Sequence, residues 1–130
     1  MTLQALAYIN GRLTGAGLNY HFGRYDYGEG SPQYPYHVGE YNEDDAENED
    51  GGQQTTLTIH SWARGAGAAL ALEQDKAKIR ALFPPAGGDR AILDGSGVVV
   101  SYGRSQYIPT GDSELKRLET TIIVNEWSEE

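Results

Sequence analysis

The sequence predicts an α+β domain, in which a mainly antiparallel (mixed) sheet of about four to five strands packs two helices on one face. Apolar residues recur at helical spacing in two separate segments, and they alternate with polar residues in the segments between and after these. The length of 130 residues is typical of one domain. We therefore expect residues 1–130 to form a single domain in the order helix, strands, helix, strands.

The first helix is predicted to begin after Thr2, whose hydroxyl suits the N-cap position. Leu3, Leu6, Ile9 and Leu13 follow a spacing of three or four residues and would form one apolar stripe. The glycine-rich turn that follows is expected to end this helix.

Two strands are predicted before the middle of the chain. Alternating rings over residues 20–27 favour a strand with a glycine-rich return, because aromatic residues are common in strands. Residues 34–39 predict a second strand, with Pro35 near its start, where a sheet tolerates proline.

The second half of the chain begins with the clearest strand pattern, at residues 55–62. Leu57 and Ile59 are expected on one face, and Thr56, Thr58, His60 and Trp62 on the other. Residues 68–83 predict the strongest helix, which Pro84 ends. Two further strands are predicted over about 97–108 and 118–127, with a turn at 93–97 leading into the first of them.

The composition excludes several classes of protein. The absence of cysteine removes disulfides, thiolate zinc sites and a thiol nucleophile. A formal charge of −9 argues against a general nucleic-acid binder, and no apolar run or charged leader indicates a membrane span or secretion. Leu, Ile, Val and Phe make up only 25 of the 130 residues, so the core should be small and would gain from burial between subunits.

The negative charge is concentrated in one segment. Between residues 40 and 50 lie seven acidic residues and no base, whereas the remaining acids and bases almost balance. Like charges repel and extend a chain, so residues 40–54 are predicted to form a mobile loop within the domain. A loose divalent-cation site is the alternative, but the spacing does not match an EF-hand loop.

No motif indicates an enzyme. The chain has no phosphate-binding glycine loop, and its paired glycines lack the third glycine of a dinucleotide site. His21, His37 and His60 have no metal-ligand spacing, and a dyad of His60 with Ser61 lacks an accompanying nucleophile-elbow motif. We therefore predict no catalytic residues, no cofactor and no metal.

The order of the segments resembles a known family. Tyr34–Gly39 precedes an acidic loop, Thr56–Trp62 precedes a helix of about 16 residues, and Leu93–Gly95 leads into a strand before Thr120–Val124. This order is similar to that of the tail terminator, or tail-completion, proteins of long-tailed bacteriophages and prophages. The "P-Y-x-V-G" and "T-I-H-x-W" strands carry most of the resemblance, which covers nearly the whole chain.

The resemblance implies a structural protein of the virion, assembled in the host cytoplasm and located at the head-proximal end of the tail. Members of the family form a homo-oligomeric ring, typically a hexamer, that caps the tail tube, stops its polymerisation and offers the head–tail joining surface. The implied partners are the tail tube protein and a head-completion or connector protein, and DNA passes through the channel without specific binding.

Aromatic and basic residues are the candidates for oligomer or partner contacts. Rings are enriched at interface hot spots, and arginines can pair with acidic neighbours. The candidates are Tyr25, Tyr27, Tyr34, Trp127, Arg64 and Arg104, with Arg12 and Arg24 as further bases. Filling of the small core is the alternative role for the rings.

The acidic loop suggests two hypotheses for a ring. It would either line the channel and repel DNA, or contact a basic patch on a neighbouring subunit. The residues concerned are Glu43, Asp44, Asp45, Glu47, Glu49 and Asp50.

Two other functions remain open at this point. Another head–tail connector protein would share much of the same sequence pattern. An acidic DNA mimic would suit the net charge, but such a protein should spread carboxylates along a whole face.

Overall fold

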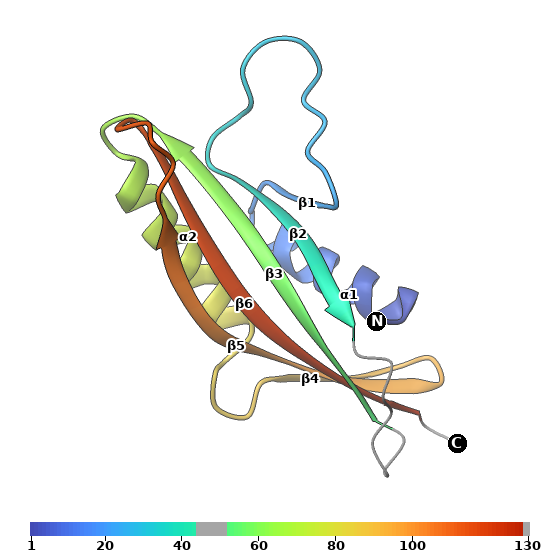
Figure 1. The fold of residues 1–130 in the computed structure, drawn as a ribbon. Coiled ribbons are helices and arrows are strands. Elements are labelled where there is room, and N and C mark those ends of the chain that lie inside the picture. The colour runs from blue at the N-terminus through green and yellow to red at the C-terminus, as the bar shows by residue number, and fades with distance from the viewer. Residues whose placement is uncertain (44–51, 129–130) are drawn as a thin grey trace.

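The computed structural model describes residues 1–43 and 52–128 (Figure 1). Its elements are α1 (Leu3–Gly15), β1 (Tyr20–Phe22), β2 (Tyr36–Glu43), β3 (Gln53–Arg64), α2 (Ala68–Leu82), β4 (Asp89–Leu93), β5 (Ser96–Ile108) and β6 (Leu115–Ser128). The strands form one curled sheet in the order β1-β2-β3-β6-β5-β4. All neighbours run antiparallel except β1 and β2, which run parallel.

Both helices cover the same face of the sheet (Figure 1). The apolar strand residues on this face are fully buried, as Leu57 and Ile59 of β3 and Ile122 of β6 illustrate, and a few polar residues are buried among them. They meet Ile9 of α1 and Ile79 of α2 in one core cluster. The opposite strand positions are partly exposed, so the protein has two layers and one sheet face without a helix, which we call the open face.

Helix α1 begins as expected, because the Thr2 hydroxyl accepts a hydrogen bond of 3.1 Å from the Ala5 backbone N–H. Its predicted apolar stripe is wrong in part. The buried face consists of Ala5, Ile9 and Leu13, whereas Leu3 is 81% exposed. At 3.6 residues per turn, Leu3 lies about 200° around the helix from Ala5, so burial of Ala5 turns Leu3 toward solvent.

The sheet has six strands rather than four to five. The additional strand, β4, forms a hairpin with the start of β5 around the predicted turn. In the aromatic stretch at 20–27, only residues 20–22 form a strand, because Gly23 turns the chain with a φ of +83°.

The predicted loop at 40–54 is shorter than expected. β2 continues to Glu43 and β3 begins at Gln53, so polar residues at both ends belong to a hairpin. Pairing across the hairpin, with Glu40 opposite Thr58, outweighs the poor strand preference of these residues. The predicted mobility of the centre of this loop concerns residues outside those that the structure describes.

No helix among residues 1–43 and 52–128 is long and apolar enough to cross a membrane.

The Tyr20 ring of β1 packs directly against Gly39 of β2. Tyr20 is buried at 4% exposure, and a Cβ atom at Gly39 would collide with its hydroxyl end. Burial also raises the pKa of the Tyr20 phenol well above its usual value of about 10. The packing of Tyr20 against Gly39 and the burial of its phenol each lead to one prediction.

We expect Gly39→Ala to lower the free energy of unfolding by about 1–3 kcal/mol, because the added methyl group overpacks the core against Tyr20. The control is Gly11→Ala, an exposed helix position with open space around it, which should stabilise the protein by about 0.5–1 kcal/mol. Chemical denaturation of the three proteins measures both effects, and an unchanged midpoint for Gly39→Ala would contradict the packing.

We expect Tyr20 to contribute to unfolding in alkali. Its folded-state pKa lies above its unfolded pKa, so its contribution to stability is complete below about pH 10 and is lost as pH rises further. Tyr20→Phe should therefore reduce the dependence of the unfolding free energy on pH above 10, by up to about 1.4 kcal/mol per pH unit. Equal slopes for the two proteins would disprove this role.

Candidate functional site

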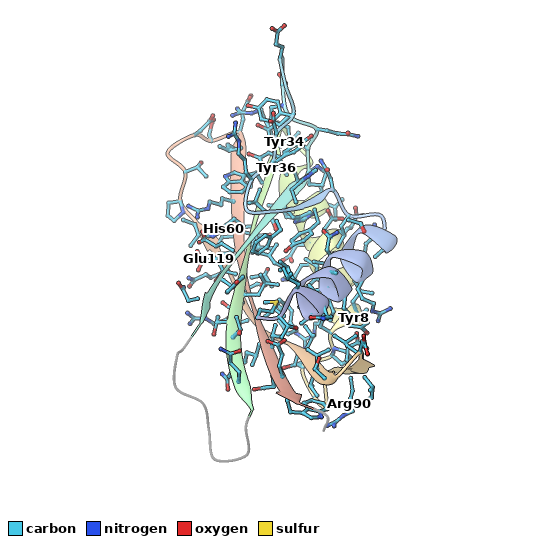
Figure 2. All side chains as sticks on the ribbon, turned by 90° about the vertical axis from the view of Figure 1, so that its right-hand side faces the viewer. Tyr8, Tyr34, Tyr36, His60, Arg90 and Glu119 are labelled. Atoms are coloured by element: carbon cyan, nitrogen blue, oxygen red, sulfur yellow. The ribbon has the colours of Figure 1, made fainter. Side chains whose placement is uncertain are left out.

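The open face carries a group of aromatic side chains at one end. We define the aromatic cluster as His21, Tyr25, Tyr27, Tyr34, Tyr36, His60 and Trp62. Its centre is a row of three rings, in which Tyr36 lies 4.9 Å from Tyr25 and 5.1 Å from Trp62 between ring centroids. Figure 2 shows Tyr34, Tyr36, His60 and Glu119 following one another along the side of the sheet away from α1.

The cluster forms because two sheet positions and one folded loop meet. Tyr36 and Trp62 are opposite each other in the pairing of β2 with β3, and both side chains point to the open face. The loop before β2 is held by two hydrogen bonds to Gln33. The Gln33 backbone N–H donates to the Tyr25 hydroxyl at 3.2 Å, and the Gln33 carbonyl accepts from the Asn19 side chain at 3.0 Å.

Two arginines lie over these rings. The Arg117 guanidinium is 5.4 Å from the Trp62 centroid, and that of Arg64 is 6.0 Å from the Tyr34 centroid. Arg64 also donates to Asp112 at 3.0 Å. Hydrogen bonds to Tyr34 and then to Asp112 raise the pKa of Arg64. The backbone N–H of Glu114, followed by Arg64, lowers the pKa of Asp112.

A polar chain continues from the rings across the open face. Arg117 donates to His60 Nδ1 at 2.8 Å, and His60 Nε2 lies 2.8 Å from Glu40 Oε1. Because arginine can only donate, Nδ1 is the acceptor and Nε2 carries the proton that Glu40 accepts. Glu119 lies 3.9 Å from His60 Nδ1. Arg117 and Glu40 are thus joined through the His60 ring, while the Arg117 Nε atom is buried without a hydrogen-bond partner in the described residues.

The open face suits contact with another protein. Partly buried Tyr and Trp rings with neighbouring arginines have the composition of interface hot spots, and their geometry is held by the contacts around them. Tyr27 is the most exposed ring of the cluster, at 47%.

The structure brings together four of the residues predicted from sequence, namely Tyr25, Tyr27, Tyr34 and Arg64. Trp127 lies elsewhere, packed over Gly97 and beneath Arg90. Arg104 is on β5 opposite Thr121. Of the remaining candidate bases, Arg12 pairs with Asp89 at 3.2 Å and Arg24 is exposed.

Of the acidic candidates, only Glu43 belongs to the residues that the structure describes. Glu43 is the last residue of β2. Asp44, Asp45, Glu47, Glu49 and Asp50 lie outside the described residues.

Sequence analysis missed Tyr36 and Arg117 as members of this surface. Alternation along β3 correctly placed His60 and Trp62 on one face, but it could not show which side chains of β2 and β6 lie opposite them.

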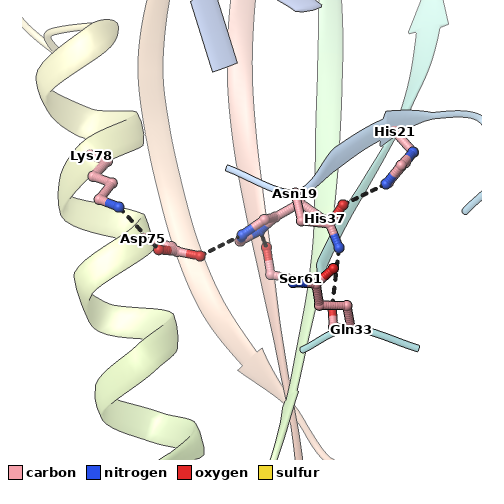
Figure 3. Close-up of polar contacts among 7 residues, drawn as sticks. All are labelled: Asn19, His21, Gln33, His37, Ser61, Asp75 and Lys78. Atoms are coloured by element: carbon pink, nitrogen blue, oxygen red, sulfur yellow. Dashed lines mark hydrogen bonds and ion pairs between the residues drawn. The ribbon is translucent and has the colours of Figure 1, made fainter. Parts of the chain in front are cut away.

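A second polar cluster is buried beneath α2 (Figure 3). His37 Nδ1 lies 2.6 Å from Ser61 Oγ, and His37 Nε2 lies 2.8 Å from Asp75 Oδ2. The three residues come from β2, β3 and α2, so these bonds tie one helix to two strands. Asp75 also lies 3.9 Å from Lys78.

This cluster does not have the arrangement of a serine hydrolase. In such enzymes His Nε2 faces the serine and Nδ1 faces the carboxylate, the reverse of what is seen here. Ser61 and His37 are each only 1% exposed, which leaves the hydroxyl out of reach of a substrate. The cluster acts as a buried structural tie. The prediction that the protein is not an enzyme stays a prediction.

Among residues 1–43 and 52–128, no three His, Asp or Glu side chains are grouped to hold a metal ion.

No protein-family model and no curated protein matches the chain. Its function is therefore inferred from its residues and fold.

We expect Ser61→Ala to lower the free energy of unfolding by about 1–3 kcal/mol, because it leaves His37 Nδ1 buried without a partner. Lys78→Ala is the control. The half-exposed Lys78 lies at the edge of the same cluster, and its loss should change stability by less than about 1 kcal/mol. Thermal and denaturant unfolding give the comparison, and equal stability of the two variants would argue against the tie.

Proposed function

We propose that this protein is a structural protein of a long-tailed phage or prophage virion, a tail terminator. It forms an oligomeric ring that caps the tail tube, stops its polymerisation and provides the head–tail joining surface. The observation that carries the proposal is a sheet covered by helices on one face only, with the aromatic cluster on its open face. Such a face is suited to burial against another subunit or against the tube.

The two motifs behind the resemblance lie side by side in the fold. Residues of "P-Y-x-V-G" fall in β2 and those of "T-I-H-x-W" in β3, and these strands pair with Tyr36 opposite Trp62. Their stacked rings form the centre of the aromatic cluster. The segments that carry the resemblance are thus the ones that build the candidate interaction surface, and this supports the proposal.

The size of the core gives further support. The cluster of buried apolar residues draws on both helices and the central strands, but Leu70, Ile92 and Tyr107 remain exposed at 65%, 67% and 45%. A small domain with exposed apolar residues gains stability when subunits associate.

Charge on the open face favours a structural role over DNA mimicry. His60, Arg117 and Arg64 stand among the acidic groups of this face. A phosphate mimic would need carboxylates without interleaved cations. A head–tail connector protein remains the nearest alternative, and the choice of partner distinguishes it from a terminator.

The test is the mass of the protein in solution by light scattering, alone and mixed with tail tube protein, with tube length followed by electron microscopy. We expect a ring, or a monomer that assembles on tube ends and limits tube length. A strict monomer without effect on tubes would overturn the proposal, and binding only to a head connector would favour the alternative.

We expect Tyr27→Ala to weaken ring formation or tube capping at least about fivefold, since removal of a hot-spot ring costs more than about 1 kcal/mol. Leu3→Ala is the matched control, because Leu3 is exposed on α1, away from the open face. If both variants cap tubes like the wild type, the aromatic cluster does not face a partner.

A further inference from the structure

Half of strand β5 has a free edge. β4 pairs with β5 only along Ser96–Val100, and the Tyr102 N–H then donates to the Phe83 carbonyl at 2.8 Å. Beyond this point, residues 104–108 pair with β6 on one side, and no strand of the described chain pairs with them on the other. Such an edge can accept an extended segment of another chain.

Basic side chains lie on both sides of this edge. On the helix side, the Arg80 guanidinium of α2 lies 5.4 Å from the Tyr102 centroid. On the other side, Arg104 stands opposite Thr121 on the open face. Within the described residues, neither arginine forms an ion pair, although both are exposed.

An apolar groove continues from the end of the free edge. It has a volume of about 560 Å³ and is lined by Tyr107, Pro109 and Leu115 together with Ala69 of α2. The bases Lys116 and Arg117 also line it, with one acid, Asp112, which pairs with Arg64 at 3.0 Å. The edge and groove therefore present backbone hydrogen-bonding groups, apolar surface and positive charge to one ligand. This combination fits an acidic polypeptide segment.

We propose that this basic edge of β5 is the docking site for a second copy of the chain, which binds through its acidic run at residues 40–50. That run carries seven of the 19 acidic residues and no base. The rest of the chain, nearly balanced in charge, offers no comparable segment to the unpaired Arg80 and Arg104. Charge complementarity thus selects the chain itself as the occupant.

The positions of the two surfaces make the contact head-to-tail. Gln53, where β3 resumes after the acidic run, is level with Glu126 and hence with Val98 near the start of β5. The free edge ends at Ile108, at the opposite end of the sheet (Figure 1). A contact between two different surfaces generates a closed ring or an open filament. Because the ring is itself proposed, this docking rests on the proposed function.

Charges on an edge strand have another known use, the prevention of strand pairing between molecules. The two roles predict opposite results. If Arg80 and Arg104 hold a second copy, their removal weakens association. If they keep copies apart, their removal strengthens it.

The experiment uses charge reversal in the full chain. One variant carries Arg80→Glu and Arg104→Glu, and the other carries Asp44→Lys, Asp45→Lys and Glu47→Lys. Alone, each should associate at least about tenfold more weakly than the wild type, because like charges then meet at the contact. Mixed in equal amounts, they should associate again, since the acidic edge of one variant meets the basic run of the other.

Lys78→Glu with Arg90→Glu is the matched control, because these exposed bases lie outside the free edge and outside the aromatic cluster, and it should assemble like the wild type. Sedimentation at low and high salt measures all samples, and wild-type association should weaken as salt screens the contact. Recovery in the mixture excludes misfolding as the cause of weak association in the single variants.

The outcomes separate the two proposals. A wild type that forms no oligomer, alone or on tubes, overturns both the ring and this docking. Rings that survive both reversals, associate more strongly after them, or fail to recover in the mixture overturn the docking alone. A gel-shift assay compares DNA binding of the wild type and the Arg80→Glu/Arg104→Glu variant. If the wild type binds DNA and the variant does not, while both form rings, the edge binds nucleic acid and the docking is overturned.

Discussion

The rest of the structure depends on the alternation of side chains along β3. Burial alternates along this strand from Gln53 to Arg64, with every second residue packed under the helices. β3 pairs with β2 on one side and β6 on the other, so its register determines which of their side chains share a face. A slip of one residue would move Leu57 and Ile59 to solvent and Trp62 into the core. The core and the aromatic cluster are therefore two results of one constraint.

Local patterns predicted the elements that depend on local chemistry. The capping of α1 by Thr2, the length of α2 and the two faces of β3 are confirmed, because hydroxyl capping and side-chain periodicity act within a few residues. The strand β4 and the extension of β2 to Glu43 were not predicted. Both depend on pairing with a neighbouring strand, β5 for β4 and β3 for β2, and such a segment becomes a strand only when its partner is in place.

The candidate site was predictable to a similar extent. Composition selected Tyr25, Tyr27 and Tyr34 as contact residues, and the fold gathers them. Their meeting with Arg117 needed the pairing of β3 with β6, which no short-range pattern encodes. The buried tie of His37 to Ser61 and Asp75 was missed for the same reason, since it joins two strands and a helix without a characteristic spacing.

The two proposed surfaces differ in how their charges are satisfied. On the open face, Arg117 and Glu40 each hydrogen-bond to His60, and Arg117 also lies over the Trp62 ring, so these groups have partners before any contact forms. At the edge of β5, Arg80 and Arg104 have no such partner within the described chain, and burial there requires acidic groups from outside. Contacts through the open face should thus depend on rings and shape, and contacts through the edge on ionic strength. A subunit with these two kinds of surface can associate with its own copies and with a different protein under separate control.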